Sequence, residues 1–288
     1  MWLYSTCDNV DGKQARKTNS SSPLGELFDH GCDALVCTLG FIMKMSALAL
    51  GREEHFHVSK IGLLLLTWCF IIPTWEEFHT GVLYLGYINA PTEGIISFCL
   101  IFLLSARYSV EKIFDWQLTA DLNLVDAVVY AFMGFLFIIC LPKAVYNVHK
   151  SSRSLNIQQL VPMFAVSLFV VNWWSNPESF TNSPDYLIHF IAIVGLISAK
   201  YATKIIYAHL LAEGFPLSTK MVWPIITGSL LYGKYGIDAP YEPQFLVVSL
   251  IITLCCYVTW HYHVVNSISQ YLGIYCFSLR RRPSKKLK

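Results

Sequence analysis

Long apolar segments recur along almost the whole chain, and they constrain the fold more than any other feature. A helix needs about 20 mostly apolar residues to cross a bilayer. Eight stretches of the 288-residue sequence approach or exceed that length, at residues 34–50, 58–74, 86–106, 124–146, 160–174, 186–212, 221–234 and 244–265. The sequence therefore predicts an all-α, polytopic membrane bundle of about eight transmembrane helices.

The composition agrees with this prediction. Apolar residues make up 55% of the chain and charged residues 14%, whereas soluble domains carry about 25% charged residues. A disordered chain, a soluble nucleic-acid binder and an ordinary cytosolic enzyme are excluded, and the net charge of +2 is too small to indicate a polyanionic partner. The nine cysteines include no C-x2-C pair, so they are predicted to be small buried side chains and not a zinc or redox site.

Four charged residues interrupt the predicted spans, namely Lys44, Asp126, Lys200 and Lys204. Charges at membrane depth are costly and usually face a cavity or a partner. For Lys200 and Lys204 three alternatives stay open: contact with a lipid phosphate, pairing with Asp126 or Glu76, and snorkelling to the interface.

Two further polar stretches lie at or within the predicted spans. Glu76, Glu77 and His79 stand at the end of one span, and an interfacial role is favoured for them over a role in a site. Residues 89–93, which read Asn-Ala-Pro-Thr-Glu, are expected to be re-entrant or interfacial.

The loops differ in their content of Lys and Arg, which predicts the orientation. If the spans alternate in direction, one set of loops together with the tail holds thirteen Lys and Arg, and the other set holds five. Cytosolic loops carry the excess of basic residues in membrane proteins. The first set, including the basic tail at 279–288, is therefore expected to be cytosolic.

The residues between Asp8 and Asp33 are predicted to form a helical hairpin. The first arm is expected to end near Arg16, and Ser22 followed by Pro23 is a typical helix start. Asp8 and Asp11 then share one face of the first arm, and Asp29 and Asp33 share one face of the second. At about 1.5 Å per residue both pairs lie within one turn of the same depth, so antiparallel arms can bring four carboxylates together.

Such a cluster indicates a metal site. Clustered carboxylates repel unless cations lie between them, and oxygen ligands suit Mg²⁺, Mn²⁺ or Ca²⁺. Two such ions can stabilise an in-line phosphoryl displacement. Gly12, Ala15 and Gly25 would let a nucleotide approach closely, and Arg16 at the mouth of the hairpin suits a phosphate.

His30 is the predicted base of this site. Glu26 precedes it by one helical turn and is expected to orient the imidazole. A histidine beside carboxylates can accept a proton near neutral pH.

The motif in this hairpin resembles a known family. The pattern D-x2-D-G-x2-A-R-x8-G-x3-D-x3-D is that of the CDP-alcohol phosphatidyltransferases, and the longer string DGKQARKTNSSSPLGELFDHGCDAL is similar to their eukaryotic choline/ethanolamine phosphotransferase branch. Looser similarity extends over the whole chain, which is taken as a single membrane domain at 1–288 with the hairpin at 8–33. The family pattern falls on Asp8, Asp11, Gly12, Ala15, Arg16, Gly25, Asp29 and Asp33.

The resemblance implies a reaction and a setting. Phosphocholine or phosphoethanolamine passes from the CDP-alcohol to diacylglycerol, giving phosphatidylcholine or phosphatidylethanolamine and CMP. The four aspartates bind two Mg²⁺ or Mn²⁺ ions, Asp33 also counts as catalytic, and His30 is the base with Glu26 in support. Homodimers in the membrane of the endoplasmic reticulum or Golgi, with the site open to the cytosol, are implied as well.

One departure from the family opens alternatives. The family has ten helices, and this chain begins near the end of the second, so an N-terminally truncated member is expected. A catalytically inactive paralogue or isoform that regulates or dimerises with a full-length enzyme is one alternative. A cation transporter is another, although no second half of the sequence mirrors the carboxylates as inverted repeats would.

Overall fold

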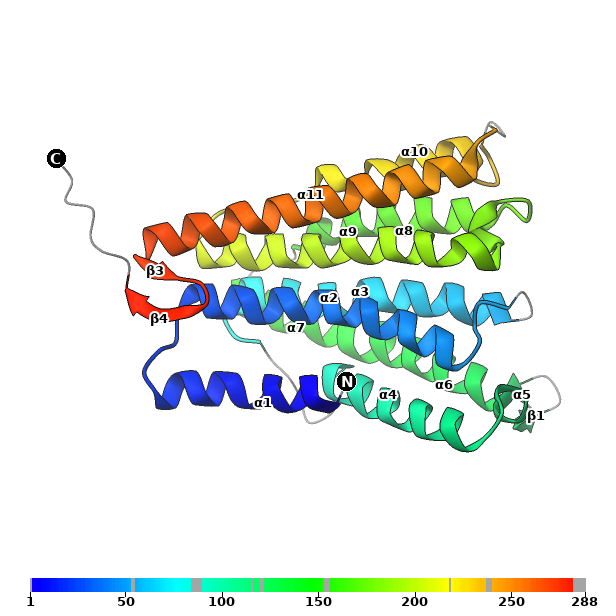
Figure 1. Cartoon of the computed structure of the whole chain (residues 1–288), viewed down its shortest axis with the longest axis horizontal. Coiled ribbons are helices and arrows are strands. Elements are labelled where there is room, and N and C mark those ends of the chain that lie inside the picture. Colours follow the sequence, from blue (N-terminus) through cyan, green and yellow to red (C-terminus); the bar gives the residue numbers. More distant parts are fainter. Residues whose placement is uncertain are drawn as a thin grey trace.

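A computed structural model describes residues 2–52, 55–83, 90–114, 116–119, 122–152, 156–217, 219–236 and 240–281, with only the backbone described for 90–94 and 279–281. The chain is a bundle of helices that run roughly along one axis (Figure 1). The helices are α1 (Trp2–Lys17), α2 (Pro23–Ala47), α3 (Phe56–Thr80), α4 (Ala90–Arg107), α5 (Val110–Phe114), α6 (Leu124–Gly134), α7 (Leu141–Ser152), α8 (Val161–Trp174), α9 (Pro184–Leu210), α10 (Trp223–Tyr232) and α11 (Glu242–Tyr271).

Shorter elements connect these helices. A π-helical segment η2 (Phe135–Cys140) makes α6 and α7 continuous, and η3 (Asn156–Leu160), η4 (Phe180–Asn182) and η5 (Lys220–Val222) are single 3₁₀ turns. Two small antiparallel ribbons pair β1 (Gln117–Thr119) with β2 (Leu122–Asn123), and β3 (Ile274–Tyr275) with β4 (Ser278–Arg281). The predicted all-α class is confirmed.

Each of the eight predicted apolar segments coincides with a helix, although not all are long enough to cross a membrane. In the described part of the chain, five helical stretches are sufficiently long and apolar: Phe56–Thr80, Leu124–Ser152, Asn156–Trp174, Pro184–Leu210 and Glu242–Tyr271. Helix α10 has only 10 residues, which at about 1.5 Å each reach half of a hydrocarbon core of about 30 Å. Of the stretch 89–93, residue 89 lies outside what the structure describes and residues 90–93 form the first turn of α4; the tail beyond 281 is likewise outside the described residues.

Helix α9 forms the centre of the bundle. It packs against α2, α3 and α11, and it is the most deeply buried of the five candidate spans. Small residues allow the close approach to α2: a Cβ atom at Gly195 would overlap the side chain of Thr38, and one at Gly31 would lie 3.4 Å from Cγ2 of Thr203. This contact fixes the depth of α2, and α2 carries half of the predicted hairpin.

The contacts of Lys44, Asp126 and Lys200, three of the charges within the predicted spans, can be named. Lys44 donates to Oγ of Ser97 at 3.2 Å and lies over the ring of Phe98. Oδ1 of Asp126 lies 2.9 Å from Nε2 of His57. The ammonium nitrogen of Lys200 lies 5.5 Å from the ring centroid of Trp260. Because Asp126 pairs with His57, the structure does not favour the alternative in which Lys200 pairs with Asp126.

A buried carboxylate ties the last helix to the bundle at the end away from the predicted hairpin. Glu242, the first residue of α11, accepts hydrogen bonds from Nε1 of Trp173 at 2.7 Å, Oγ of Ser179 at 2.6 Å and the backbone N–H of Phe180 at 3.0 Å. Burying a carboxylate is costly unless its oxygens are paired, and here three donors pair them. Glu242 thereby links α8, η4 and α11.

Candidate active site

The predicted helical hairpin is present, with the predicted ends. Helix α1 ends at Lys17 and α2 begins at Pro23, where Oγ of Ser22 accepts the backbone N–H of Gly25 at 3.1 Å. Serine at the N-cap and proline at the first helical position each favour a helix start, so these residues fix the point where α2 begins. Helix α1 has no buried residue and lies alongside α2 (Figure 1).

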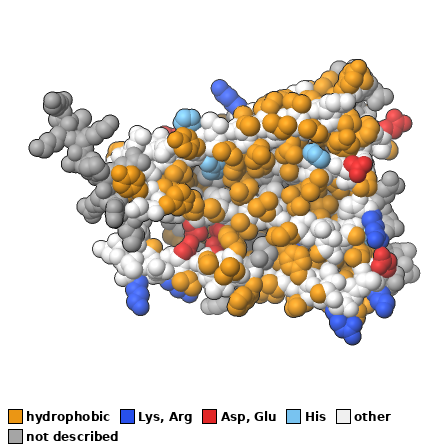
Figure 2. All heavy atoms as spheres, viewed as in Figure 1, with side chains coloured by type: hydrophobic (Ala, Val, Ile, Leu, Met, Phe, Trp, Pro, Cys, Tyr) orange, Lys and Arg blue, Asp and Glu red, His pale blue; other side chains and the backbone are white. Residues whose placement is uncertain are grey.

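Three of the four predicted aspartates come together. Carboxylate oxygens of Asp8, Asp29 and Asp33 all lie within 4.8 Å of one another, and each residue is half-buried. A group of acidic side chains lies left of the centre, over α1 and α2, on a face that is otherwise largely apolar (Figure 2). This spacing allows one cation to contact all three carboxylates, and oxygen donors of this kind suit Mg²⁺ or Mn²⁺.

Asp11 lies outside this group. Its side chain is exposed, and one carboxylate oxygen accepts the backbone N–H of Gly12. Its charge nevertheless acts on the cluster: burial, followed by repulsion from Asp11, raises the pKa of Asp29 to about 6. Burial also raises the pKa of Asp33, although the hydrogen bond that Asp33 accepts from the hydroxyl of Tyr4 opposes this shift. Like charges held together in this way favour a proton or a cation among them.

The predicted nucleotide-contacting residues line the hairpin. A methyl group at Gly12 would meet Nη1 of Arg16 at 3.5 Å, and one at Gly25 would meet Oγ of Ser22 at 3.5 Å. Both are ordinary van der Waals distances, so packing within this chain does not require glycine at either position. The lack of a side chain therefore leaves space beside the carboxylates. Ala15 is half-buried and Arg16 is exposed at the end of α1.

His30 lies next to the cluster but has a different partner from the one predicted. Nδ1 of His30 is 3.8 Å from Oε2 of Glu77, and the two side chains are 17% and 11% exposed. Glu26 is exposed, and no hydrogen bond between it and His30 is found in the described structure. The sequence favoured an interfacial role for Glu77 because it stands at the end of a predicted span. Glu77 is 47 residues from His30 along the chain, and only the packing of α3 against α2 brings the two side chains together.

The end of α3 that carries Glu77 is held by polar contacts with α7 and η3. Nδ2 of Asn147 donates to Oε1 of Glu76 at 2.6 Å. Oε1 of Gln159 accepts from Nε1 of Trp75 at 3.0 Å and lies 2.6 Å from Nε2 of His79. These contacts fix the last turn of α3, so they position Glu77 against His30.

Comparison with known proteins identifies the family. Residues 1–198 match the family model described as CDP-alcohol phosphatidyltransferase. The chain belongs to this family. The resemblance inferred from the motif is thus confirmed.

Similar proteins include members of the branch that the motif indicated. Choline/ethanolaminephosphotransferase 1 of Arabidopsis thaliana is 31% identical over 309 residues, covering 98% of this chain and 77% of the relative. The Saccharomyces cerevisiae protein of the same name is 29% identical, with 98% and 76% covered. Ethanolaminephosphotransferase 1 of Homo sapiens is 29% identical, with 98% and 72% covered.

Proposed function

We propose that this chain transfers phosphocholine or phosphoethanolamine from a CDP-alcohol to diacylglycerol. The observation that carries the proposal is the convergence of Asp8, Asp29 and Asp33 at the part of α2 that also carries His30, whose charge acts on Asp29. The names of the relatives, which are choline/ethanolamine- and ethanolaminephosphotransferases, support the choice of substrates.

The residues fit a divalent metal site. Asp8, Asp29 and Asp33 would hold the ions, and Asp11 is close enough for its charge to affect Asp29. Mg²⁺ or Mn²⁺, when bound, supplies the positive charge that neutralises the oxygens of the pyrophosphate. Arg16 would add a guanidinium fork for a phosphate, and Gly12, Ala15 and Gly25 would leave room for the nucleotide.

His30 takes the proton in the proposed step. The hydroxyl oxygen of diacylglycerol forms a bond to the β-phosphorus of the CDP-alcohol, and the bond from that phosphorus to the bridging oxygen breaks. CMP leaves with the bonding electrons, and the hydroxyl proton passes to His30. Because Nδ1 of His30 is turned to Glu77, the proton is accepted at Nε2. Glu77 then stabilises the imidazolium, so Glu77 takes the supporting position beside His30 for which the sequence indicated Glu26.

We also propose a cytosolic position for the aspartate end of the bundle. The thirteen-to-five distribution of Lys and Arg between the two sets of loops supports this orientation. The endoplasmic reticulum or Golgi location and the homodimer stay predictions of the family resemblance.

A phosphotransferase assay tests the proposal. The chain is expressed in membranes without endogenous activity and supplied with diacylglycerol, Mg²⁺ or Mn²⁺, and labelled CDP-choline or CDP-ethanolamine. Labelled phospholipid is expected, its loss is expected in Asp29→Ala, and Asp185→Ala is the control because Asp185 is an exposed aspartate of α9 outside the acidic cluster. Absence of product from this chain, both alone and fused to the upstream segment of a relative, would show that the proposed reaction is wrong.

A further inference from the structure

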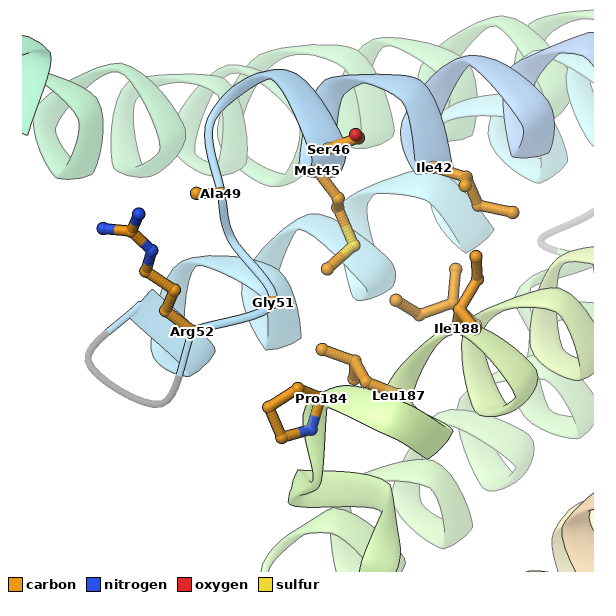
Figure 3. Close-up of a pocket in the computed structure, with 10 residues that line it drawn as sticks. Ile42, Met45, Ser46, Ala49, Gly51, Arg52, Pro184, Leu187 and Ile188 are labelled. Carbon is orange, nitrogen blue, oxygen red and sulfur yellow. The ribbon is translucent and has the colours of Figure 1, made fainter. Parts of the chain in front are cut away.

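A cavity opens at the end of α2 that lies away from the aspartates. Its volume is about 320 Å³, and it lies between the last turns of α2, the turn that follows them and the first turns of α9 (Figure 3). Ile42, Met45, Leu187, Ile188 and Ile191 form most of its wall, so the lining is predominantly apolar. Along α2, Met45 is twelve residues from Asp33, which at about 1.5 Å per residue is about 18 Å.

The position of the cavity determines what can fill it. Helix α9 is a candidate membrane span that begins at Pro184, so its first turns lie just inside one membrane boundary. Ile188, in the cavity wall, is 49% exposed, so this part of the wall faces lipid. A buried water needs two to four polar partners, which an apolar wall does not offer, and an empty cavity forfeits dispersion contacts. Hydrocarbon is therefore the occupant that the surroundings favour.

The volume suits part of a lipid chain. A water-sized group takes up about 30 Å³ in a liquid, so 320 Å³ accommodates on the order of ten such groups. Methylene groups are of similar size, and their burial is favourable where the alternative is water. In a bilayer that alternative is other hydrocarbon, so the chain alone gives little selectivity. Selectivity for one class of lipid therefore requires a polar group of the protein at the membrane boundary.

Arg52 is the polar residue at the boundary. It belongs to the cavity wall, and its side chain points away from the apolar lining (Figure 3). Nη1 lies 3.0 Å from Oε1 of Glu111, and the two side chains are 51% and 60% exposed, so this ion pair is weak and a lipid phosphate can reach the guanidinium alongside Glu111. A guanidinium binds phosphate oxygens well because its N–H groups form a planar fork.

We propose that this cavity binds a glycerophospholipid of the leaflet opposite the aspartate cluster. One acyl chain occupies the space between α2 and α9, and the phosphodiester lies at Arg52. The site requires a phosphate as well as a chain, so diacylglycerol, which has the same chains and no phosphate, binds it less well. This inference concerns a second lipid site and does not depend on the proposed reaction.

Photolabelling in nanodiscs tests the site without an activity measurement. Two probes are compared, a phosphatidylcholine and a diacylglycerol, each with the same acyl chain carrying a diazirine. Labelling of peptides that contain Met45 or Ile188 is divided by labelling of the peptide that contains Leu254 of α11. Leu254 is 48% exposed, so its labelling measures the non-specific contact of the protein with surrounding lipid. We expect the relative labelling by phosphatidylcholine to exceed that by diacylglycerol by up to about fivefold, which is the ratio that one exposed ion pair between Arg52 and the phosphodiester can give.

Matched variants separate the two parts of the site. Arg52→Gln is expected to lower phosphatidylcholine labelling by up to about fivefold, whereas Arg107→Gln, at the end of α4 and not in the cavity wall, leaves it unchanged. Ile188→Trp fills the mouth and is expected to reduce labelling by both probes, with Leu254→Trp as the control of equal exposure. Equal labelling by the two probes, or labelling that Arg52→Gln and Ile188→Trp leave unchanged, would show that there is no phospholipid site here.

Discussion

The contact between His30 and Glu77 predicts a loss of activity whose size follows from its geometry. Nδ1 and Oε2 lie 3.8 Å apart, in side chains that are only 17% and 11% exposed. Two unit charges near this separation attract by about 4 kcal/mol at an effective dielectric constant of about 20, and by about 1 kcal/mol in bulk water. Because desolvation offsets part of the attraction between buried charges, roughly 2–3 kcal/mol is left to stabilise the imidazolium that forms during transfer.

The change that tests this value is Glu77→Gln, which keeps the shape of the side chain and removes its charge. A loss of roughly 2–3 kcal/mol corresponds to a fall in kcat of about 30- to 150-fold. KM for the CDP-alcohol should change little, because Glu77 stabilises a charge that exists only after proton transfer. Initial rates of labelled phospholipid formation, at equal protein amounts in membranes, give both constants.

Glu26→Gln is the matched control. Glu26 is exposed and lies one turn before His30 on the same helix, and an exposed charge pair contributes at most about 1 kcal/mol. The rate of phospholipid formation by Glu26→Gln should therefore stay within about fivefold of the wild-type rate. If Glu26→Gln lost more activity than Glu77→Gln, the sequence-based choice of Glu26 would be correct, and Glu77 would not be the residue that stabilises the imidazolium.

Three further predictions concern the metal and the stability of the fold. Chelation with EDTA should abolish lipid formation, and Mg²⁺ or Mn²⁺ should restore it in the wild type but not in Asp33→Ala; activity that persists after chelation would exclude a metal at the aspartates. Glu242→Ala leaves three donors without their acceptor, so it should lower the free energy of unfolding by roughly 3–5 kcal/mol, measured by thermal unfolding in detergent. Glu242→Gln should recover part of this loss, because its Oε1 can still accept from Trp173 and Ser179. Equal stability of Glu242→Ala and the wild type would contradict the hydrogen bonds described. Ala212 follows the last turn of α9 with φ of +53°, a conformation that costs an L-residue roughly 1–2 kcal/mol. Ala212→Gly should therefore raise the free energy of unfolding by up to about 1 kcal/mol. Ala202→Gly, inside α9, is the control and should lower it.

The features that the sequence predicts well are those that depend on neighbouring residues. Ser22 and Pro23 fix the start of α2 because the N-cap bond and the fixed φ of proline act within one turn. The spacing of Asp29 and Asp33 places both on one helical face, and the turn at residues 18–22 brings Asp8 back to them. Local rules of this kind also give the apolar segments that become helices.

The features that the sequence did not predict depend on how the helices pack against each other. The depth of α3 relative to α2 decides that His30 meets Glu77, and no local pattern encodes it. The carboxylate of Asp11 accepts the N–H of Gly12 and lies outside the group formed by Asp8, Asp29 and Asp33, which helical spacing alone cannot show. The cavity near Arg52 likewise exists only once α2 and α9 have packed.

The bonds of Glu242 imply an order of assembly. Trp173 and Glu242 are 69 residues apart, and α11, which begins at Glu242, is synthesised after α8, which carries Trp173. Until α11 has entered the membrane, the indole N–H of Trp173 and the donors of the following loop have no carboxylate to bond. The bundle therefore completes its packing only in a late step after synthesis of α11, and a nascent chain arrested before that step would expose unpaired polar groups, which cellular quality control can recognise.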